Sequence, residues 1–258
     1  MEESLKIWKY MDFPKFASML TTGSLYFACP SQFNDPYEGS VPRSHARAES
    51  EIVHKLVDDI LALRPHFAAQ SSDSVERLDD LMRTLRSNLR TAPKKAVLRF
   101  GVSCWHLSEY ESEAMWRLYS ALGQGIAIES TIGKLKASLG RREGVQIDAV
   151  RYVDFDQAQI EKGHRHYTLF MKKKCFEHEK ELRATILLPQ EGKGIPVSCD
   201  LDVLISRVHV SPFVESYMRD TVEALCKGNA HVLRKPVLQS QLQSEPDYGI
   251  EIDLGAAS

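Results

Sequence analysis

The sequence predicts an α+β domain with small mixed or antiparallel sheets and an inserted helical hairpin. Short stretches with the alternation typical of β-strands are separated by stretches with helical spacing along most of the chain. Between about residues 44 and 91 the alternation disappears, and apolar residues recur only at helical spacing. We therefore expect one domain over residues 1–242, with the hairpin at about 44–91 and a flexible tail at 243–258.

Three short elements are expected before the insertion. Residues 5–10 alternate in side-chain character, which is typical of a strand. Asp12 and Pro14 then begin a short helix, and Gly23 ends it. Residues 24–28 form a second strand that leads into a polar loop.

The hairpin is expected to consist of two antiparallel amphipathic helices. A break at Arg64 and Pro65 separates two sets of apolar residues at helical spacing. Asp73 and Glu76 form a capping box at the start of the second helix. The first set is Ile52, Val53, Leu56, Val57, Ile60 and Leu61, and the second is Val75, Leu78, Met82, Leu85 and Leu89.

Strands and helices continue to alternate after the hairpin. Ser130 is expected to cap one helix, and Ser211 with Pro212 begins the last one, which runs toward Gly228. The expected strands are residues 96–105, 124–130, 145–153, 179–188 and 205–210, and the expected helices are residues 111–122 and a polar helix at 156–173.

Composition limits the class of protein. A net charge of -2 gives no general attraction to nucleic acid. The five cysteines are single and scattered, without a Cys-x-x-Cys pair, which is typical of reduced thiols in a cytosolic protein. The chain starts with Glu2 and Glu3 where a signal peptide would be basic, and no apolar run reaches membrane-spanning length. We therefore expect a cytoplasmic protein with no membrane partner.

The stretch CFEHEKELR concentrates carboxylates. In a strand, Glu177, Glu179, Glu181 and Arg183 share one face, because side chains alternate. Neighbouring carboxylates are then roughly 7 Å apart, from a rise of about 3.3 Å per residue. Their repulsion requires compensation by Arg183, Lys174 or a cationic ligand. The alternative interpretation is a solvated strand face or a frayed helix end.

The loop FNDPYEG at residues 33–39 has two interpretations. Asn34, Asp35 and Pro36 favour a turn, and Gly39 releases the chain after it. The second interpretation is a ligand-binding loop whose side chains form the edge of a pocket.

Trp116 and Tyr119 lie three residues apart on one side of an expected helix. This spacing is typical of core packing, or of an aromatic wall for a planar ligand. The histidines and cysteines lack the spacing of a metal site, and no Gly-x-Ser-x-Gly elbow indicates a serine nucleophile. We expect no metal cofactor.

Four stretches, taken in order, carry a resemblance to a known family. They are IWKY followed by GSLYFACPSQFNDPYEG, then VSCW, then MWRLYSALGQGIAIE, and finally KKKCFEHEKELR. Together they resemble a bacterial family known only as domain of unknown function number 2971. Its members share a K-Y start, an F-N-D-P-x-E loop, an M-W-x-x-Y helix followed by Gly, and an E-x-E-x-R strand. The blocks span most of residues 5–190, and the family label implies no function.

The order of the elements also resembles the ADP-ribosyltransferase superfamily, whose folds bind NAD in a cleft between two small sheets. That superfamily uses His or Arg on the first strand, Tyr or Ser on a middle strand and Glu on a late strand. Lys9 or Tyr10 takes the first position here, Ser103 or Tyr26 the second, and EHEKE is similar to the Glu-x-Glu of the arginine-modifying branch.

This resemblance implies NAD as the substrate and assigns roles to the candidate residues. Cleavage of the bond between nicotinamide and ribose develops positive, oxocarbenium-like charge on the sugar, which a carboxylate stabilises. Glu181 would support this cation, and Glu179 would orient the acceptor. The implied binding residues are Lys9, Tyr10 and Tyr26 near the nicotinamide, Asn34 and Asp35 at the pocket rim, Trp116 and Tyr119 as an aromatic wall, and Arg183 or Lys174 at a phosphate.

We therefore expect an NAD-using ADP-ribosyltransferase-like enzyme or NAD glycohydrolase, in a bacterial stress or phage-defence system. Its partners would be a nucleotide-type small molecule and a macromolecular acceptor, either protein or nucleic acid. Two alternatives stay open. One is a non-catalytic ligand- or partner-binding module that uses the hairpin as its contact surface. The other is a metal-dependent nuclease in which Asp35, Glu38, Glu179 and Glu181 hold a divalent ion and Lys174 assists.

Overall fold

The computed structural model describes residues 1–119, 124–140, 142–158, 166–230, 232 and 234–244. The predicted α+β class is confirmed, and the main sheet, with seven strands, is larger than expected. Its strand order is β11-β10-β4-β1-β3-β8-β5, and two small sheets, β2-β9 and β6-β7, accompany it. Neighbouring strands of the main sheet are antiparallel except β10 and β11, which are parallel.

The described elements have the following bounds. The strands are β1 (Lys6–Asp12), β2 (Ser24–Phe27), β3 (Phe100–Leu107), β4 (Gly125–Thr131), β5 (Gln146–Ala149), β6 (Arg151–Val153), β7 (Met171–Lys173), β8 (Glu181–Leu187), β9 (Ile195–Ser198), β10 (Arg207–Val210) and β11 (Val237–Gln239). The α-helices are α1 (Phe13–Thr22), α2 (Arg43–Ala62), α3 (Arg64–Gln70), α4 (Ser72–Val97), α5 (Glu113–Tyr119), α6 (Ile132–Leu139), α7 (Leu201–Leu204) and α8 (Ser216–Lys227). Short 3₁₀ helices are η1 (Pro30–Gln32), η3 (Tyr167–Phe170) and η4 (Lys174–Glu179).

The two faces of the main sheet differ in chemistry. The register aligns Glu181 with His106, His106 with Trp8, Trp8 with Glu129 and Glu129 with Arg207. Side chains alternate along each strand, so these five residues lie on one face, which we call the polar face. The opposite face carries the main hydrophobic core, which also takes side chains from α1, α6, α7 and α8.

The first helix follows the predicted capping pattern. Asp12 is the N-cap of α1, and its side chain accepts a hydrogen bond from the backbone N–H of Lys15. Gly23 ends the helix with a φ of 58°, in the left-handed region that glycine adopts at low cost. Phe16, Met19 and Leu20 are buried in the core.

The main sheet is narrowly joined between β1 and β3. Only two residue pairs connect these strands, Ile7 with Leu107 and Trp8 with His106. Further along β3, Val102 exchanges two backbone hydrogen bonds with Ala28 instead. By contrast, β1 pairs with β4, and β3 with β8, over their full lengths. The sheet therefore consists of two well-paired halves that meet at a short seam.

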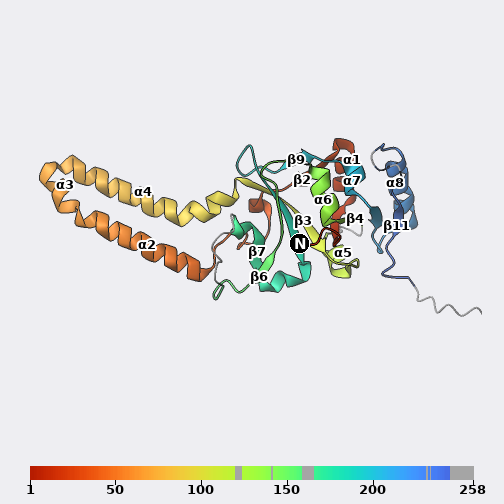
Figure 1. The fold of residues 1–258 in the computed structure, drawn as a ribbon, viewed down its shortest axis with the longest axis horizontal. Helices are drawn as coiled ribbons and strands as arrows, with labels where there is room; N and C mark the ends of the chain where they lie inside the picture. Colours follow the sequence, from red (N-terminus) through yellow and green to blue (C-terminus); the bar gives the residue numbers. More distant parts are fainter. Residues whose placement is uncertain (120–123, 141, 159–165, 231, 233, 245–258) are drawn as a thin grey trace, which may run out of the picture.

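Helices α2, α3 and α4 form the predicted hairpin, which extends away from the rest of the molecule (Figure 1). The two long helices bury a small cluster, Val57, Leu78 and Met82, between them. The expected capping box was wrong, because the side chain of Ser71 caps α4 and accepts from the backbone N–H of Ser74. The hairpin also continues beyond residue 91, since α4 ends at Val97.

Two other element predictions were wrong in detail. Residues 145–153 form two strands, β5 and β6, because the backbone N–H of Val150 bonds to Glu181 and the chain then turns to pair with β7. The expected polar helix at 156–173 is replaced at its end by η3 and β7, while residues 159–165 lie outside the described residues. Parallel pairing of β7 with β6 thus overrides local helical pattern.

Helix starts were displaced in two places. Thr131 caps α6, because the Ser130 hydroxyl donates to the backbone carbonyl of Leu204. The last helix begins at Ser216 rather than Ser211.

Strands β9 and β11 were not predicted, and most of the expected tail at 243–258 lies outside the described residues. None of the helices in the described part of the chain combines the length and hydropathy that crossing a bilayer requires.

Candidate functional site

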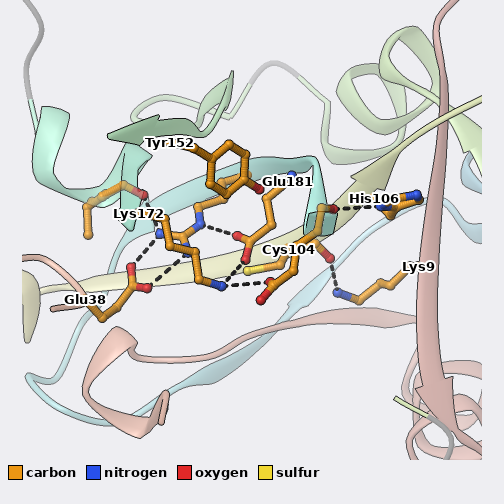
Figure 2. Close-up of polar contacts among 10 residues, drawn as sticks. Lys9, Glu38, Cys104, His106, Tyr152, Lys172 and Glu181 are labelled. Atoms are coloured by element: carbon orange, nitrogen blue, oxygen red, sulfur yellow. Dashed lines mark hydrogen bonds and ion pairs between the residues drawn. The ribbon is translucent and has the colours of Figure 1, made fainter. Parts of the chain in front are cut away.

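Five ionisable side chains meet at the polar face of the sheet and form what we call the ionic cluster (Figure 2). All five are buried, and Arg183 and Glu181 are only 0% and 4% exposed. Burying charge is costly unless the groups are paired and hydrogen-bonded, so this arrangement must be held by its contacts. The members of the cluster are Glu38, Lys172, Glu179, Glu181 and Arg183.

Strand β8 supplies two members of the cluster. Glu181 is its first residue and Arg183 its third, so both side chains lie on the polar face. Glu179 is not in the strand as predicted but ends η4, and Glu177 in the same 3₁₀ helix is exposed. Lys180, between Glu179 and Glu181, has a φ of 41°, and this left-handed turn connects η4 to β8.

Glu179 and Glu181 share one cation. The ammonium of Lys172 donates to Oε2 of Glu179 and to Oε1 of Glu181, at 2.7 Å in each case. The two carboxylate oxygens therefore lie within twice that distance of each other. Lys172 reaches them from β7, which belongs to the small sheet with β6.

Arg183 holds the other side of the cluster. Its Nε donates to Oε2 of Glu181 at 2.6 Å, and its two terminal nitrogens donate to the two oxygens of Glu38. One terminal nitrogen also donates to the backbone carbonyl of Leu169 at 2.6 Å. Such fork-shaped recognition of a carboxylate is specific to arginine. Arg183 thus links β8 to the 33–39 loop and to η3.

The cluster contains three acids and two bases, and this imbalance is reflected in the pKa values. Burial and the neighbouring carboxyl of Glu181 together raise the pKa of Glu179 to about 7, although the ammonium of Lys172 acts in the opposite direction. Burial alone would raise the pKa of Glu181 as well, but the Arg183 guanidinium holds that pKa well below its usual range. The pair therefore contains one carboxylate that stays ionised and one carboxyl that binds a proton near neutral pH.

Three further side chains surround the carboxyl pair. Nδ1 of His106 donates to the backbone carbonyl of Glu179 at 2.6 Å, and burial lowers the pKa of this imidazole. The hydroxyl of Tyr152 accepts from the backbone N–H of Glu181 at 2.7 Å. Burial raises the pKa of Tyr119, and the carboxylates of Glu179 and Glu181 raise it further. The site thus offers neutral hydrogen-bonding groups beside the carboxyls.

The 33–39 loop is a turn that positions a buried carboxylate. Asp35 Oδ1 accepts a hydrogen bond from the backbone N–H of Tyr37. The backbone carbonyl of Asp35 accepts one from the backbone N–H of Glu38. Tyr37 packs against Phe155, and the ammonium of Lys173 lies 3.7 Å from the centre of its ring. These contacts direct Glu38 toward Arg183. The loop therefore acts through Glu38 rather than through Asn34 and Asp35.

Lys9 and Tyr10 lie on opposite faces of the sheet, because they are consecutive in β1. The ammonium of Lys9 donates to Oγ of Ser103 at 3.1 Å and to the backbone carbonyl of Cys104 at 3.0 Å, so it bridges the seam between β1 and β3. Burial lowers the pKa of Lys9 to about 8. The structure therefore brings together the candidate cation of the first strand and the candidate serine of the middle strand.

Tyr10 and Trp116 belong to an aromatic core on the polar face. Their rings meet edge to face with centroids 5.0 Å apart, and Trp116 is fully buried. The Tyr10 hydroxyl accepts from the backbone N–H of Ser112, and the indole N–H of Trp116 donates to Glu111. Both rings are thus engaged in packing, whereas Tyr119 of the same helix is partly exposed beside the carboxyls.

The remaining candidates do not join the cluster. Tyr26 is half exposed on β2, which pairs with β9 outside the main sheet. Asn34 is exposed, and Oδ2 of Asp35 is buried without a hydrogen-bond partner in the described part of the chain. Lys174 is exposed in η4.

Two members of the ionic cluster were absent from the predicted NAD site. Glu38 was considered only as a ligand in the nuclease alternative, although its loop was singled out. Lys172 lies in a run of three lysines, KKK at 172–174, and nothing in the sequence separates it from its neighbours. Its burial depends on the pairing of β7 with β6, which residue pattern does not reveal.

The carboxylates of the cluster are bound to cations from the chain itself. Among the described residues, no group of three or more His, Cys, Asp or Glu side chains is placed to hold a metal ion. Cys104 lies beside the cluster, but burial raises its pKa to about 12, which makes its thiol a poor nucleophile.

A separate hollow of about 330 Å³ opens further along the polar face. Glu129 at its wall is paired with Arg207 and His209, at 3.0 and 3.1 Å. The hollow is lined by Lys6, Trp8, Glu109, Tyr110, Glu111, Glu129, Gln241 and Leu242, so no member of the ionic cluster contributes to it.

Comparison with family profiles, with curated proteins and with solved structures finds no match for this chain. The two resemblances drawn from the sequence therefore stay predictions.

Proposed function

We propose that the chain is an NAD-using enzyme, either an ADP-ribosyltransferase or an NAD glycohydrolase, with Glu179 and Glu181 at its centre. The observation that carries this proposal is that both carboxyls lie buried side by side on the ammonium of Lys172 at the start of β8. A site that holds one positive charge between two carboxylates is suited to stabilise a cation that develops during a reaction.

The two carboxyls suit different steps of this reaction. Glu181, kept ionised by Arg183, stabilises the positive charge on ribose as the bond from its C1 carbon to the nicotinamide nitrogen breaks. The bonding electrons leave with nicotinamide, which becomes neutral. A hydroxyl of water or of an acceptor then bonds to C1, and Glu179 takes its proton, for which a pKa of about 7 is suitable.

The placement of the candidate strands supports the same proposal. The first strand, the middle strand and the late strand of the resemblance correspond to β1, β3 and β8, which are neighbours in that order in the main sheet. Lys9 and Ser103, assigned to the first two positions, are hydrogen-bonded to each other, on the face of the sheet opposite Glu181. We further propose membership of family 2971 and a cytoplasmic stress or phage-defence role, for which the sequence blocks and the single cysteines are the support.

Release of nicotinamide from NAD tests this function. The purified chain is incubated with NAD, alone and with protein or nucleic-acid acceptors, and free nicotinamide is quantified by chromatography. We expect release by the wild-type chain and its loss in Glu181→Gln. Glu177→Gln is the matched control, because Glu177 is an exposed carboxylate of the same segment. Thermal unfolding of each variant identifies any loss of activity that results from unfolding.

Two results would overturn the proposal. One is the absence of nicotinamide release by the folded wild-type chain under every acceptor condition. The other is release by Glu181→Gln at the wild-type rate, which would assign the carboxyl pair to stability alone.

A further inference from the structure

The hairpin exposes a stripe of large apolar side chains on α2. Ile52, Leu56 and Leu63 are 70%, 52% and 54% exposed. They are spaced by four and seven residues, which places them on one face of the helix. Leu63 extends this face because it keeps helical backbone angles at the C-cap. The stripe is about 16 Å long, from a rise of about 1.5 Å per residue.

Packing within the hairpin leaves this stripe uncovered. The contact between α2 and α4 uses a different face of α2, represented by Val57, which packs with Leu78 and Met82 of α4. Long helices draw most of their stability from packing of an apolar face, so α2 would gain stability from a further partner that covers the exposed stripe. Figure 1 shows the hairpin extending away from the sheet, where the rest of the chain does not cover it.

We propose that α2 packs antiparallel against α2 of a second copy of this chain, so that the exposed stripes of the two copies cover each other. Ile52 and Leu63 lie at equal distances from a point between residues 57 and 58. An antiparallel pair centred there places Ile52 of one copy beside Leu63 of the other, and the two Leu56 side chains near the centre. Such a twofold contact uses the same surface on both copies and closes on itself, which gives a dimer and not a filament.

Charges beside the stripe fit the same arrangement. Lys55 and Asp59 flank it on one side, and the antiparallel pair places Lys55 of each copy beside Asp59 of the other. Both side chains are exposed, and neither has an ion-pair partner within 4.0 Å among the residues that the structure describes. The charge pattern is therefore compatible with the antiparallel pair.

The shape of the molecule permits this contact. Because the hairpin extends from one side of the sheet, antiparallel pairing places the two bodies at opposite ends of the helix pair (Figure 1). The segment of α2 between Arg43 and the centre of the stripe is about 20 Å long. This length leaves room for the tip of the second hairpin beside the first turns of α2. The ionic cluster lies in the body, so dimerisation does not depend on the proposed function.

Sedimentation of the full chain over a series of concentrations tests the proposal. We expect the wild type to form a dimer, and Leu56→Glu to raise its dissociation constant by about a hundredfold or more, because each dimer loses two buried leucines. Leu187→Glu is the matched control, since Leu187 is a leucine of similar exposure at the end of β8. Helix content from circular dichroism confirms that each variant is folded.

A charge-exchange pair identifies the partner and the orientation. Lys55→Glu should weaken the dimer, and the double variant Lys55→Glu with Asp59→Lys should restore it. A wild-type chain that stays monomeric at every concentration would overturn the proposal. An equal effect of Leu187→Glu and Leu56→Glu, or a double variant as weak as Lys55→Glu, would also overturn it.

Discussion

Glu179 and Glu181 lie on the same ammonium group, at 2.7 Å from Nζ of Lys172. They are two residues apart but belong to different elements, the end of η4 and the start of β8. Their pKa values are displaced in opposite directions, because Arg183 contacts Glu181 and does not contact Glu179. This division between a permanently ionised carboxylate and a protonatable carboxyl leads to the first predictions.

Arg183→Ala should lower the free energy of unfolding by about 3–5 kcal/mol. The substitution leaves Glu38 buried without its cation and Glu181 with Lys172 alone, and it removes the link to the carbonyl of Leu169. Denaturant unfolding measures the change. Arg117→Ala is the control, because the exposed pair of Arg117 with Glu113 should contribute less than about 1 kcal/mol. Similar losses for the two variants would contradict the account of the cluster.

Glu179→Gln should remove part of the pH dependence of stability. The folded pKa of about 7 lies above the ordinary value of about 4.3, so the folded state binds this proton more tightly than the unfolded state. The resulting stability is complete below about pH 4 and is lost as the pH rises through 7.

Glutamine imitates the protonated carboxyl, so the variant keeps this contribution at high pH. We expect the wild type to lose about 1–3 kcal/mol more than Glu179→Gln between about pH 5 and about pH 8, as measured by urea unfolding. Burial also raises the pKa of Glu38, but this group is present in both proteins and its contribution cancels. The difference between the two proteins therefore isolates Glu179. Parallel stability curves would show that Glu179 is ionised throughout this range.

Lys172→Met should destabilise the chain more at about pH 8 than at about pH 5. At the higher pH both Glu179 and Glu181 carry charge and lose their shared cation, whereas at the lower pH Glu179 binds a proton. Unfolding at the two pH values measures the effect. Lys174→Met serves as the control, because Lys174 is exposed in the same lysine run. An equal loss at both pH values would be inconsistent with a shared ammonium.

Gly39→Ala should destabilise the fold and displace Glu38 from Arg183. Gly39 has a φ of 69°, and a Cβ atom there would collide with the side chain of Val97 at the end of α4. Gly140→Ala is a suitable control, since its φ is also positive, at 65°, but its Cβ would meet no atom within 4 Å. Thermal unfolding should therefore separate the cost of collision from the cost of φ. A similar loss of stability in Gly39→Ala and Gly140→Ala would show that the positive φ alone, and not the collision with Val97, causes the effect.

The sequence was most informative where local pattern and tertiary structure agree. Alternation predicted β1 and β8, and the Asp12 and Gly23 signals predicted both ends of α1. The carboxylates of Glu179 and Glu181 were singled out correctly as neighbours, although Glu179 reaches its position from a 3₁₀ helix. Their partners were harder to find, because Lys172 and Glu38 are brought to the cluster by strand pairing and by a turn.

Residues that local pattern grouped together were separated by the fold for an equally physical reason. Lys9 and Tyr10 are adjacent in the chain, and this adjacency in a strand places them on opposite faces. Ring chemistry alone suggested that Trp116 could face a ligand, whereas the structure buries it fully against Tyr10. Side-chain type thus indicated which chemistry is present, and strand register determined where it lies.

The seam between β1 and β3 has a consequence for how the molecule yields under stress. Two residue pairs, the ammonium of Lys9 and the hydrogen bonds of Lys6 and Trp8 with Ser108 join the two halves of the sheet there, while the ladders on either side are longer. We expect the sheet to separate first between β1 and β3, with the strands of each half still paired. The hydrogen bonds from the Lys9 ammonium to Ser103 and Cys104 oppose this separation.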